Sequence, residues 1–479
     1  MLLGRLLEKF GIWGEFPKTE IISVTEKLEC VTKNSLFVAI RGRKTDGHSL
    51  IDRAFCAGAP AAVVSPDSRY AADKRCIPFE DPRGFLAAAA AVLTENPQEK
   101  LKIIAFTGTN GKSTSAHLLW HLLMEAGQKS GLIGTVFSFD GESFWESEHT
   151  TPLPEDLFPL LAKMVENGCR FCVMEASSQA LDQKRLAGLT PEIGVFTNFG
   201  QDHLDYHGSM QAYFESKLRL LSQSKQVILG IDSPPLKQLY PALSGKKSSF
   251  GFDPEAVYRG KGAKSELDGV RFSFWNGRSE SDVFFPMPGI FSAENAMAAL
   301  ACLDLLGLSG EGAKKALSSY LPLPGRAGVV LEAKNKRVMV DFAHTPDSLE
   351  AICSAIKPLC NGRLLLVFGC GGDRDRQKRP KMAKIAAKYA DRILLTDDNP
   401  RSEDPVKILS ELTPVLAEQK ADYEVIRPRE AAICQGMAEL RSGDILLLAG
   451  KGHEKTQEAD GKKQPLNEVE VVTKNRFLH

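Results

Sequence analysis

The middle of the chain alternates short apolar runs with longer helix-like patterns. An apolar run at 103–106 is followed by a polar, glycine-containing segment at 107–114 and then by a helix-like run at 116–126. Further strand-length apolar runs are separated by helical stretches, which is the pattern of an open α/β sheet. The later strands, the β-rich patch and the last helix are predicted at 171–174, 193–197, 270–285 and 293–306.

The same patterns divide the chain into three regions. Strand-like runs at 35–40 and 61–64 and an alanine-rich helix at 85–94 precede Asn96-Pro97, a pair typical of a boundary. From residue 327, strands and helices alternate again, which implies a second doubly wound domain. The strands predicted there are 338–341, 363–368, 392–396, 423–426 and 444–448. We therefore predict an α/β protein with three domains, at residues 1–98, 99–326 and 327–479, the last of them Rossmann-like.

Three polar segments marked by glycine or proline follow strands of the third region directly. They are residues 369–376, 397–401 and 450–454. Ligands of open α/β sheets bind at the carboxyl ends of strands. We therefore expect these three loops to share one crevice.

Length and charge limit the classes of function. A chain of 479 residues is too long to fold around a single hydrophobic core, and its length predicts about three domains of ~150 residues. Acidic and basic residues number 60 each, so no global field favours nucleic acid or an anionic membrane, and small molecules are the expected partners. The longest wholly apolar run, 85–93, is about half of the ~20 residues that a membrane span needs. The charged start lacks a signal-peptide pattern, so we expect a soluble cytoplasmic protein.

The ten cysteines show no framework spacing, which fits reduced thiols. Cys169 and Cys172 form a single C-x-x-C with no second pair at zinc-ribbon distance. We interpret both as buried structural thiols rather than as metal ligands or a redox pair.

The segment Thr107-Gly108-Thr109-Asn110-Gly111-Lys112-Ser113-Thr114 is typical of a phosphate-binding loop. Glycines let several backbone N–H groups point at one anion, and the start of the following helix adds its positive dipole end. Lys112 would reach the terminal phosphates of a nucleotide, and the Ser113 hydroxyl would hold Mg²⁺. The alternative is a glycine-rich turn that binds nothing.

Two further segments of the middle region end predicted strands with possible metal ligands. One carries Glu175, and the other, 197–208, carries carboxylates and imidazoles that include His203. Two divalent cations are useful where an anionic phosphate must meet an anionic carboxylate. Taken singly, Glu175 could be an edge-of-strand acid and His203 a loop histidine with a structural role.

Together these segments resemble the Mur ligases, ATP-dependent enzymes of peptidoglycan precursor synthesis that contribute to cell shape and division. Tyr213-x-x-x-Lys217 fits the same family, whose members carbamylate the lysine at this position and so convert a cation into a metal-bridging anion. The resemblance implies that Lys112, Glu175, His203 and Lys217 are catalytic, and that Ser113, Glu175, His203 and N6-carboxylated Lys217 hold two Mg²⁺ ions. The alternative for Lys217 is a surface helix lysine.

The remaining motifs, at the end of the middle region and in the third region, are similar to those of the MurE type, which adds the third residue of the stem peptide. They are Leu323-Pro324-Gly325-Arg326, 341–347, 369–376, Asp398-Asn399-Pro400-Arg401 and 450–454. Arginine after Asn-Pro is the family's signature for meso-diaminopimelate. The physics agrees, because a guanidinium grips a carboxylate with two parallel hydrogen bonds and diaminopimelate carries one more carboxylate than lysine. A solvated helix-start arginine is the alternative for Arg401.

The resemblance assigns residues to each substrate and a role to each domain. The three domains would bind the UDP substrate, ATP and the amino acid, in chain order. For ATP the residues are Gly108, Thr109, Asn110, Gly111, Lys112, Ser113, Thr114, Asn295, Arg326 and Asp341, with His344 nearby. For the UDP-muramoyl dipeptide they are Thr150, Thr151, Ser177, Gln183 and Arg185. For diaminopimelate they are Arg374, Asp398, Asn399, Arg401, Gly450 and Glu454.

The chain also departs from the family pattern. Lys27-Leu28-Glu29 stands where an Asp-Ser-Arg is usual, so no uridine contact is assigned there. Gln179 replaces a histidine, Ser292 an asparagine and Pro428 an acid. None of these changes removes a phosphate or metal ligand, so they bear on substrate affinity rather than on the type of reaction.

We therefore expect a monomeric ligase that joins meso-2,6-diaminopimelate to UDP-N-acetylmuramoyl-L-alanyl-D-glutamate, at the expense of ATP and through an acyl phosphate. A lysine-adding MurE or a folylpolyglutamate-type ligase is the nearest alternative, against which Arg401 and residues 450–454 argue. A P-loop switch or motor is the alternative from a different class, and it would leave the three loops of the third region without a role.

Overall fold

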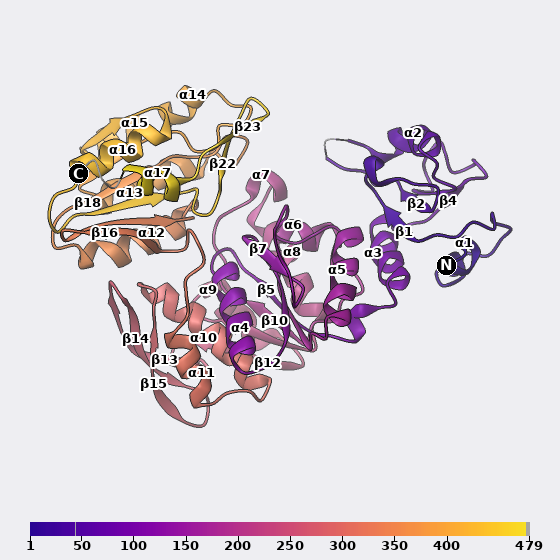
Figure 1. Cartoon of the computed structure of the whole chain (residues 1–479), viewed down its shortest axis with the longest axis horizontal. Coiled ribbons are helices and arrows are strands. Elements are labelled where there is room, and N and C mark those ends of the chain that lie inside the picture. Colours follow the sequence, from indigo (N-terminus) through magenta and orange to yellow (C-terminus); the bar gives the residue numbers. More distant parts are fainter. Residues whose placement is uncertain (44, 476–479) are drawn as a thin grey trace. The chain divides into compact units, whose positions relative to one another are not determined.

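The computed structural model describes residues 1–43 and 45–475 (Figure 1). They form two compact units. Unit 1 comprises Met1–Thr107, Gly127–Gly194 and Ser216–Gln226, and unit 2 comprises Gly108–Ala126, Val195–Glu215 and the chain from Val227 onward. Within the described chain no helix has the length and apolar composition of a membrane span.

Unit 1 begins with a four-stranded parallel sheet in the order β1-β2-β3-β4. Alternate side chains of β2 enter different cores: Leu36 and Val38 pack with α3, whereas Phe37 and Ala39 pack with α2. β2 and β3 are buried on both faces, which explains why they are nearly continuous apolar runs. The elements are α1 (Leu3–Glu8), β1 (Ser23–Thr25), β2 (Ser35–Val38), α2 (Ile51–Cys56), β3 (Ala62–Val64), β4 (Cys76–Pro78) and α3 (Pro82–Leu93).

The rest of unit 1 contains neighbouring strands of a larger sheet, in the order β5-β9-β6-β7-β8. β5, β9 and β6 are parallel, and β7 and β8 add antiparallel strands at the edge. Helix α5 packs against α3, so the two sheets share one apolar core. The elements are β5 (Lys102–Thr107), β6 (Ser130–Ile133), β7 (Phe137–Phe139), β8 (Phe144–Glu146), α5 (Pro154–Glu166), β9 (Phe171–Glu175) and α6 (Ser178–Asp182).

Unit 2 contains α4, the helix after the phosphate loop, and the strands β12 to β15. The long helix α10 packs against α4 and β13, and β13, β14 and β15 form an antiparallel meander. The unit boundary crosses β10 (Ile193–Phe196) and α8 (Met210–Gln223). The other elements are α4 (Lys112–Glu125), α7 (Leu204–His207), β11 (Gln226–Gly230), α9 (Pro234–Leu239), β12 (Lys246–Gly251), β13 (Tyr258–Glu266), β14 (Gly269–Trp275), β15 (Glu280–Phe285), α10 (Ile290–Leu305) and α11 (Glu311–Ser318).

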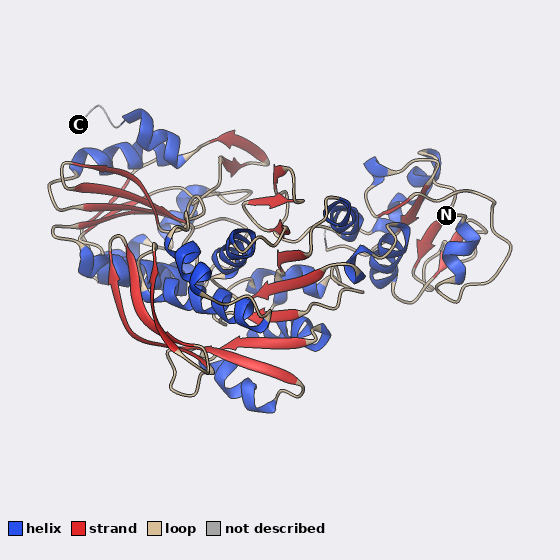
Figure 2. Cartoon of the chain, turned by 60° about the horizontal axis from the view of Figure 1, so that its bottom comes forward, coloured by secondary structure: helices blue, strands red, loops and turns tan. Residues whose placement is uncertain are grey.

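The last part of unit 2 is a six-stranded sheet in the order β16-β17-β21-β18-β19-β20, parallel except for β16. Figure 2 shows helices on both of its faces. Val338 and Val340 of β17 face α16 and α17, whereas Met339 between them is buried on the other face. The strands are β16 (Gly328–Ala333), β17 (Lys336–Asp341), β18 (Leu364–Phe368), β19 (Arg392–Leu395), β20 (Tyr423–Val425) and β21 (Ile445–Ala449), with a separate hairpin β22 (Thr456–Ala459) and β23 (Lys462–Pro465). The helices are α12 (Pro346–Ile356), α13 (Lys378–Tyr389), α14 (Pro405–Ser410), α15 (Thr413–Glu418), α16 (Arg429–Glu439) and α17 (Glu468–Asn475).

The mixed α/β class with parallel sheets, predicted from the sequence, is confirmed. The predicted strands of the third region coincide with β17 to β21, with ends that differ by one or two residues. The pattern missed the antiparallel edge strand β16 and the β22–β23 hairpin. Both are half-exposed or exposed strands in which polar and charged residues interrupt the alternation. The three domain boundaries stay predictions.

Candidate active site

Residues at the end of β10 form hydrogen bonds with the backbone of the phosphate loop. The Thr197 hydroxyl donates to the Asn110 carbonyl (2.6 Å), and the Asn198 side chain accepts from the Asn110 N–H (2.8 Å). Gly108 has φ +150°, and a Cβ there would lie 1.9 Å from Thr197 Oγ1. The loop therefore requires glycine because its backbone packs directly against the neighbouring strand end.

Gly111 meets a similar restriction at the start of α4. Its φ is +84°, and a Cβ would lie 2.3 Å from Asn295 Oδ1 on α10. The same amide oxygen accepts from the Ser115 hydroxyl (3.3 Å). Asn295, assigned to ATP from the sequence, therefore lies directly beside the phosphate loop.

We expect Gly111→Ala to weaken ATP binding, because the new methyl group displaces Asn295 and forces an L-residue into the left-handed region. That conformation alone costs about 1–2 kcal/mol. Gly127→Ala is the matched control, since Gly127 also has a positive φ (+71°) but open space around the Cβ position. The Tm measured by thermal unfolding should fall for both variants, whereas the KM for ATP should rise only for Gly111→Ala. An equal KM in the two variants would contradict the close packing.

Further ATP candidates converge on the start of α4. Arg326 Nη2 donates to the Ser113 hydroxyl (3.1 Å), and its guanidinium stacks on the Phe342 ring. The Asp341 carboxylate accepts from the N–H groups of Ala327 (2.7 Å) and Ala343 (2.8 Å), and burial raises its pKa. Asp341 thereby fixes the backbone directly after Arg326.

Lys112 contacts the loop backbone, whereas Thr109 contacts residues outside the loop. Lys112 Nζ donates to the carbonyls of Gly108 (2.9 Å) and Thr109 (3.0 Å). The Thr109 hydroxyl lies 3.2 Å from the Tyr213 hydroxyl of α8 and accepts from the Gly200 N–H (3.0 Å). Thr114 is buried in the first turn of α4. In unit 2 the structure thus brings together the whole ATP set assigned from the sequence.

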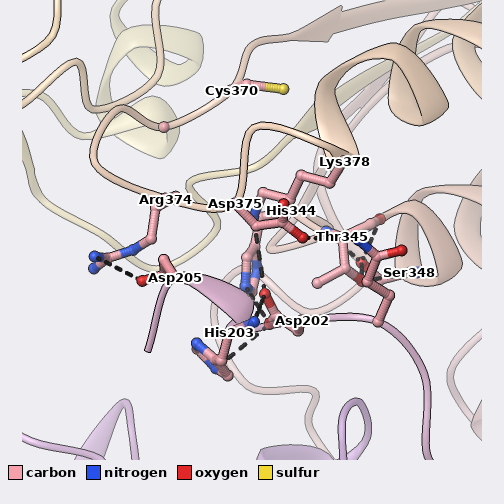
Figure 3. Close-up of polar contacts among 12 residues, drawn as sticks. Asp202, His203, Asp205, His344, Thr345, Ser348, Cys370, Arg374, Asp375 and Lys378 are labelled. Carbon is pink, nitrogen blue, oxygen red and sulfur yellow. Dashed lines mark hydrogen bonds and ion pairs between the residues drawn. The ribbon is translucent and has the colours of Figure 1, made fainter. Parts of the chain in front are cut away.

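His203 directly precedes α7, has φ +54° and lies beside a buried acid, Asp202 (Figure 3). Asp202 Oδ2 is 3.4 Å from His203 Nε2 and 3.6 Å from His344 Nε2, and its Oδ1 is 4.0 Å from Lys378 Nζ. Burial acts to raise the pKa of Asp202. The hydrogen bond from His344 and the charges of His203, His344 and Lys378 outweigh it and hold that pKa well below its usual range.

Sequence reasoning assigned no role to Asp202, Gln201 or Lys378, although Asp202 lies inside the quoted 197–208 segment. Gln201 Nε2 donates to Asp375 Oδ2 (2.8 Å). Lys378 is almost fully buried at the start of α13, and nothing in its sequence context indicates this. Together these contacts join the segment after β10 to the loop after β18.

The residues assigned to the UDP-muramoyl dipeptide lie together in unit 1. The Thr151 hydroxyl donates to the Glu175 carbonyl (2.8 Å) and accepts from the Ser177 N–H (3.1 Å). Arg185 donates to the Thr151 carbonyl (2.7 Å) and, through Nε (3.0 Å), to Gln183 Oε1. These contacts gather a hydroxyl, an amide and a guanidinium, all suited to a polar anionic ligand.

Glu175 ends β9 as a buried carboxylate next to this group. Both of its oxygens accept from Thr135, one from the N–H (2.7 Å) and one from the hydroxyl (3.0 Å). The Thr135 hydroxyl is also 3.1 Å from that of Thr150. Thr135 was not assigned from the sequence, where no motif marks it.

Two of the four proposed metal ligands, Glu175 and Lys217, belong to unit 1, and Ser113 and His203 belong to unit 2. Lys217 is 1% exposed on α8, so it is not the surface lysine of the alternative interpretation. Among residues 1–43 and 45–475, no three His, Cys, Asp or Glu side chains form a metal-binding group. The hydroxyl of Ser113 and the carboxylate of Glu175 are oxygen ligands that suit the hard cation Mg²⁺, and a carbamate on Lys217 would add further oxygens.

The three loops predicted to share a crevice do contact one another at adjacent strand ends of the last sheet. The Gly372 N–H donates to the Asn399 carbonyl (2.9 Å), and Arg401 Nη1 donates to the Gly372 carbonyl (2.9 Å). These two contacts fix the second loop against the first. Asn399 Nδ2 donates to Glu454 Oε2 (2.7 Å), which ties in the third loop.

Arg401 does not lie in a helix, which argues against the helix-start alternative. It has φ +53° and follows Pro400 in the loop after β19. Its Nε lies 3.4 Å from Glu458 Oε2, yet burial and repulsion from the nearby charge of Arg374 lower its pKa. A carboxylate would relieve that repulsion and accept from both groups.

Asp398 and Lys451 are buried members of two of these loops. The buried Lys451 donates to Asn399 Oδ1 (3.0 Å) and Glu454 Oε2 (2.7 Å), which orients both side chains. Burial acts to raise the pKa of Asp398, but the charges of Lys451 and Arg429 outweigh it, and the pKa is lowered. Gly450 has φ +117°, and a Cβ there would lie 2.7 Å from Asp398 Oδ2. Sequence reasoning quoted Lys451 only as part of a motif.

Three family models cover most of the chain. Residues 30–93 match the Mur ligase family catalytic domain, 106–303 the Mur ligase middle domain and 325–452 the Mur ligase glutamate ligase domain. The chain belongs to the Mur ligase family, and the predicted three-domain class is confirmed.

Similar proteins within the family carry a more specific name. The chain is 36% identical over 457 residues to the UDP-N-acetylmuramoyl-L-alanyl-D-glutamate–2,6-diaminopimelate ligase of Caldanaerobacter subterraneus subsp. tengcongensis, covering 95% of each chain. It is 35% identical to the ligase of the same name from Clostridioides difficile, covering 97% of each. A solved structure of a ligase of that name superposes with a TM-score of 0.70 at 28% identity over the whole of both chains.

Proposed function

We propose that this chain joins meso-2,6-diaminopimelate to UDP-N-acetylmuramoyl-L-alanyl-D-glutamate. The γ-carboxylate of the dipeptide's glutamate attacks the γ-phosphate of ATP, which gives an acyl phosphate and ADP. An amine of diaminopimelate then attacks the acyl carbon, forms the amide bond and releases phosphate. The proposal is supported by similarity to relatives with this name and by the cluster of Asn399, Arg401 and Glu454.

The proposed roles in phosphoryl transfer follow from the site geometry. Lys112 lies within the phosphate loop, where its ammonium can move from the loop carbonyls to an incoming γ-phosphate. Arg326 lies beside Ser113 and adds a second cation. Bound Mg²⁺ would neutralise phosphate charge, with Ser113, Glu175, His203 and carbamylated Lys217 as its proposed ligands.

The amino-acid preference is proposed to arise in the third region. Arg401 and Arg374 would receive the distal carboxylate of diaminopimelate, and the Glu454 carboxylate would accept from its distal ammonium. Lysine lacks that carboxylate and would leave the two guanidinium groups with only their long ion pairs, Arg401 to Glu458 (3.4 Å) and Arg374 to Asp205 (4.0 Å). The proposed substrates are therefore three small molecules, and we expect a monomeric cytoplasmic enzyme.

An ADP-release assay tests the proposal. With ATP, Mg²⁺ and the UDP-muramoyl dipeptide present, meso-diaminopimelate is expected to start turnover, and L-lysine is expected to support at least ~100-fold less kcat/KM. A lysine-adding ligase would reverse this order. A P-loop switch or motor would release ADP without either the dipeptide or the amino acid, which would contradict a ligase altogether.

A further inference from the structure

Arg429, at the start of α16, is an arginine with no exposed side-chain surface. Charged side chains are almost never fully buried unless they are paired. Its Nε donates to Glu468 Oε1 (2.8 Å), its Nη2 to the Ala449 carbonyl (2.8 Å) and its Nη1 to the Asp397 carbonyl (3.4 Å). One planar group therefore contacts an acid and two backbone carbonyls.

The two carbonyls lie at the starts of two loops of the proposed amino-acid site. Asp397 directly precedes Asp398 in the loop after β19, and Ala449 directly precedes Gly450 in the loop after β21. In the sheet, β18 lies between β19 and β21, so no ladder hydrogen bond joins these two strands. Arg429 thus connects two loop starts across the intervening strand.

Glu468 is the charged partner of this guanidinium. It begins α17 and is itself fully buried, and its Oε2 has no hydrogen-bond partner among the described residues. A buried ion pair gains little net stability, because both charges lose their hydration. Stability alone therefore does not explain the Arg429–Glu468 ion pair. Its geometry suggests another role, because it places the guanidinium between the two loops.

We propose that Arg429, held by Glu468, is a positioning residue for the amino-acid substrate. By fixing the separation of the two loop starts, it sets where Asn399 and Arg401 lie relative to Glu454. This inference rests on the proposed function and deepens it. It concerns a residue that touches no substrate and that acts through the backbone of both loops.

The test uses variants that remove the bridge in two ways. Arg429→Lys keeps a charge for Glu468 but has no planar fork for two carbonyls. The double variant Arg429→Met/Glu468→Leu removes both buried charges together. No unpaired charge is left in the core, so the protein is expected to fold. Arg392→Met is the control, because Arg392 pairs with Asp422 and Glu439 at the other end of β19, away from the loops.

We expect the KM for meso-diaminopimelate to rise by about 10–100-fold in both Arg429 variants, the usual effect of losing a group that orients a ligand contact. The KM for ATP should stay within about twofold, and Arg392→Met should leave both constants unchanged. Hydrogen exchange, measured without substrate, should become faster at 397–401 and 450–454 in the same variants.

Two results would overturn this role. The first is an unchanged KM for diaminopimelate with unchanged exchange in both loops. The second is a uniform rise of all KM values with a lower Tm, which would mark Arg429 as structural. The ADP-release assay with the wild-type protein separates the two proposals. ADP release that does not depend on diaminopimelate would contradict the proposed function. It would leave the Arg429 bridge intact, because hydrogen exchange measures the bridge without substrate.

Discussion

Replacing Lys217 with alanine is expected to abolish ligation, with a loss of roughly 10³-fold or more in kcat. Lys217 is buried on α8, one helical turn after Tyr213, whose hydroxyl contacts Thr109 of the phosphate loop. A carbamate on its amine would turn a cation into an anion that can hold Mg²⁺, and alanine can supply neither charge. The measurement is ADP release at saturating substrates.

Rescue distinguishes a lost carbamate from a lost fold. Small carboxylic acids such as acetate should restore part of the activity of Lys217→Ala, because they can occupy the space of the missing carbamate. Lys225→Ala is the control, since Lys225 is 59% exposed in an ion pair with Glu192 and should be dispensable. Full activity in Lys217→Ala would remove this residue from the proposed metal site.

The sequence allowed the phosphate loop to be predicted in detail because its chemistry lies in consecutive residues. Gly108 and Gly111 are needed for local backbone reasons, and the structure adds their close contacts with Thr197 and Asn295. The contact among the last three loops was predictable for a related reason, since parallel strands bring their carboxyl ends to one edge.

Contacts that depend on burial could not be predicted in the same way. Lys378 and Arg429 are charged residues at helix starts, where a solvated side chain is the ordinary expectation. Only the packed structure shows that Lys378 approaches Asp202 and that Arg429 reaches two loop carbonyls. The role of Thr135 was missed for the same reason, because its contact with Glu175 joins separate strand ends.

Arg401→Ala is expected to raise the KM for meso-diaminopimelate by roughly 100-fold, while the KM for ATP changes little. Removing one partner of a desolvated charge pair costs about 2–5 kcal/mol, and the neighbouring Arg374 can replace only part of the lost contact. Arg376→Ala is the matched control from the same loop cluster. Arg376 is 65% exposed and pairs with Glu403, so its removal should leave both constants near wild type.

Selectivity gives the sharper readout for Arg401. If its guanidinium binds the carboxylate that lysine lacks, Arg401→Ala should lower kcat/KM for diaminopimelate and leave the weak activity with L-lysine almost unchanged, so the preference shrinks by about the same 100-fold. Arg401→Lys should recover part of the preference, because it keeps the charge without the planar fork. Equal losses with both amino acids, or with ATP, would mean that Arg401 shapes the loop through its bond to the Gly372 carbonyl rather than reading the substrate.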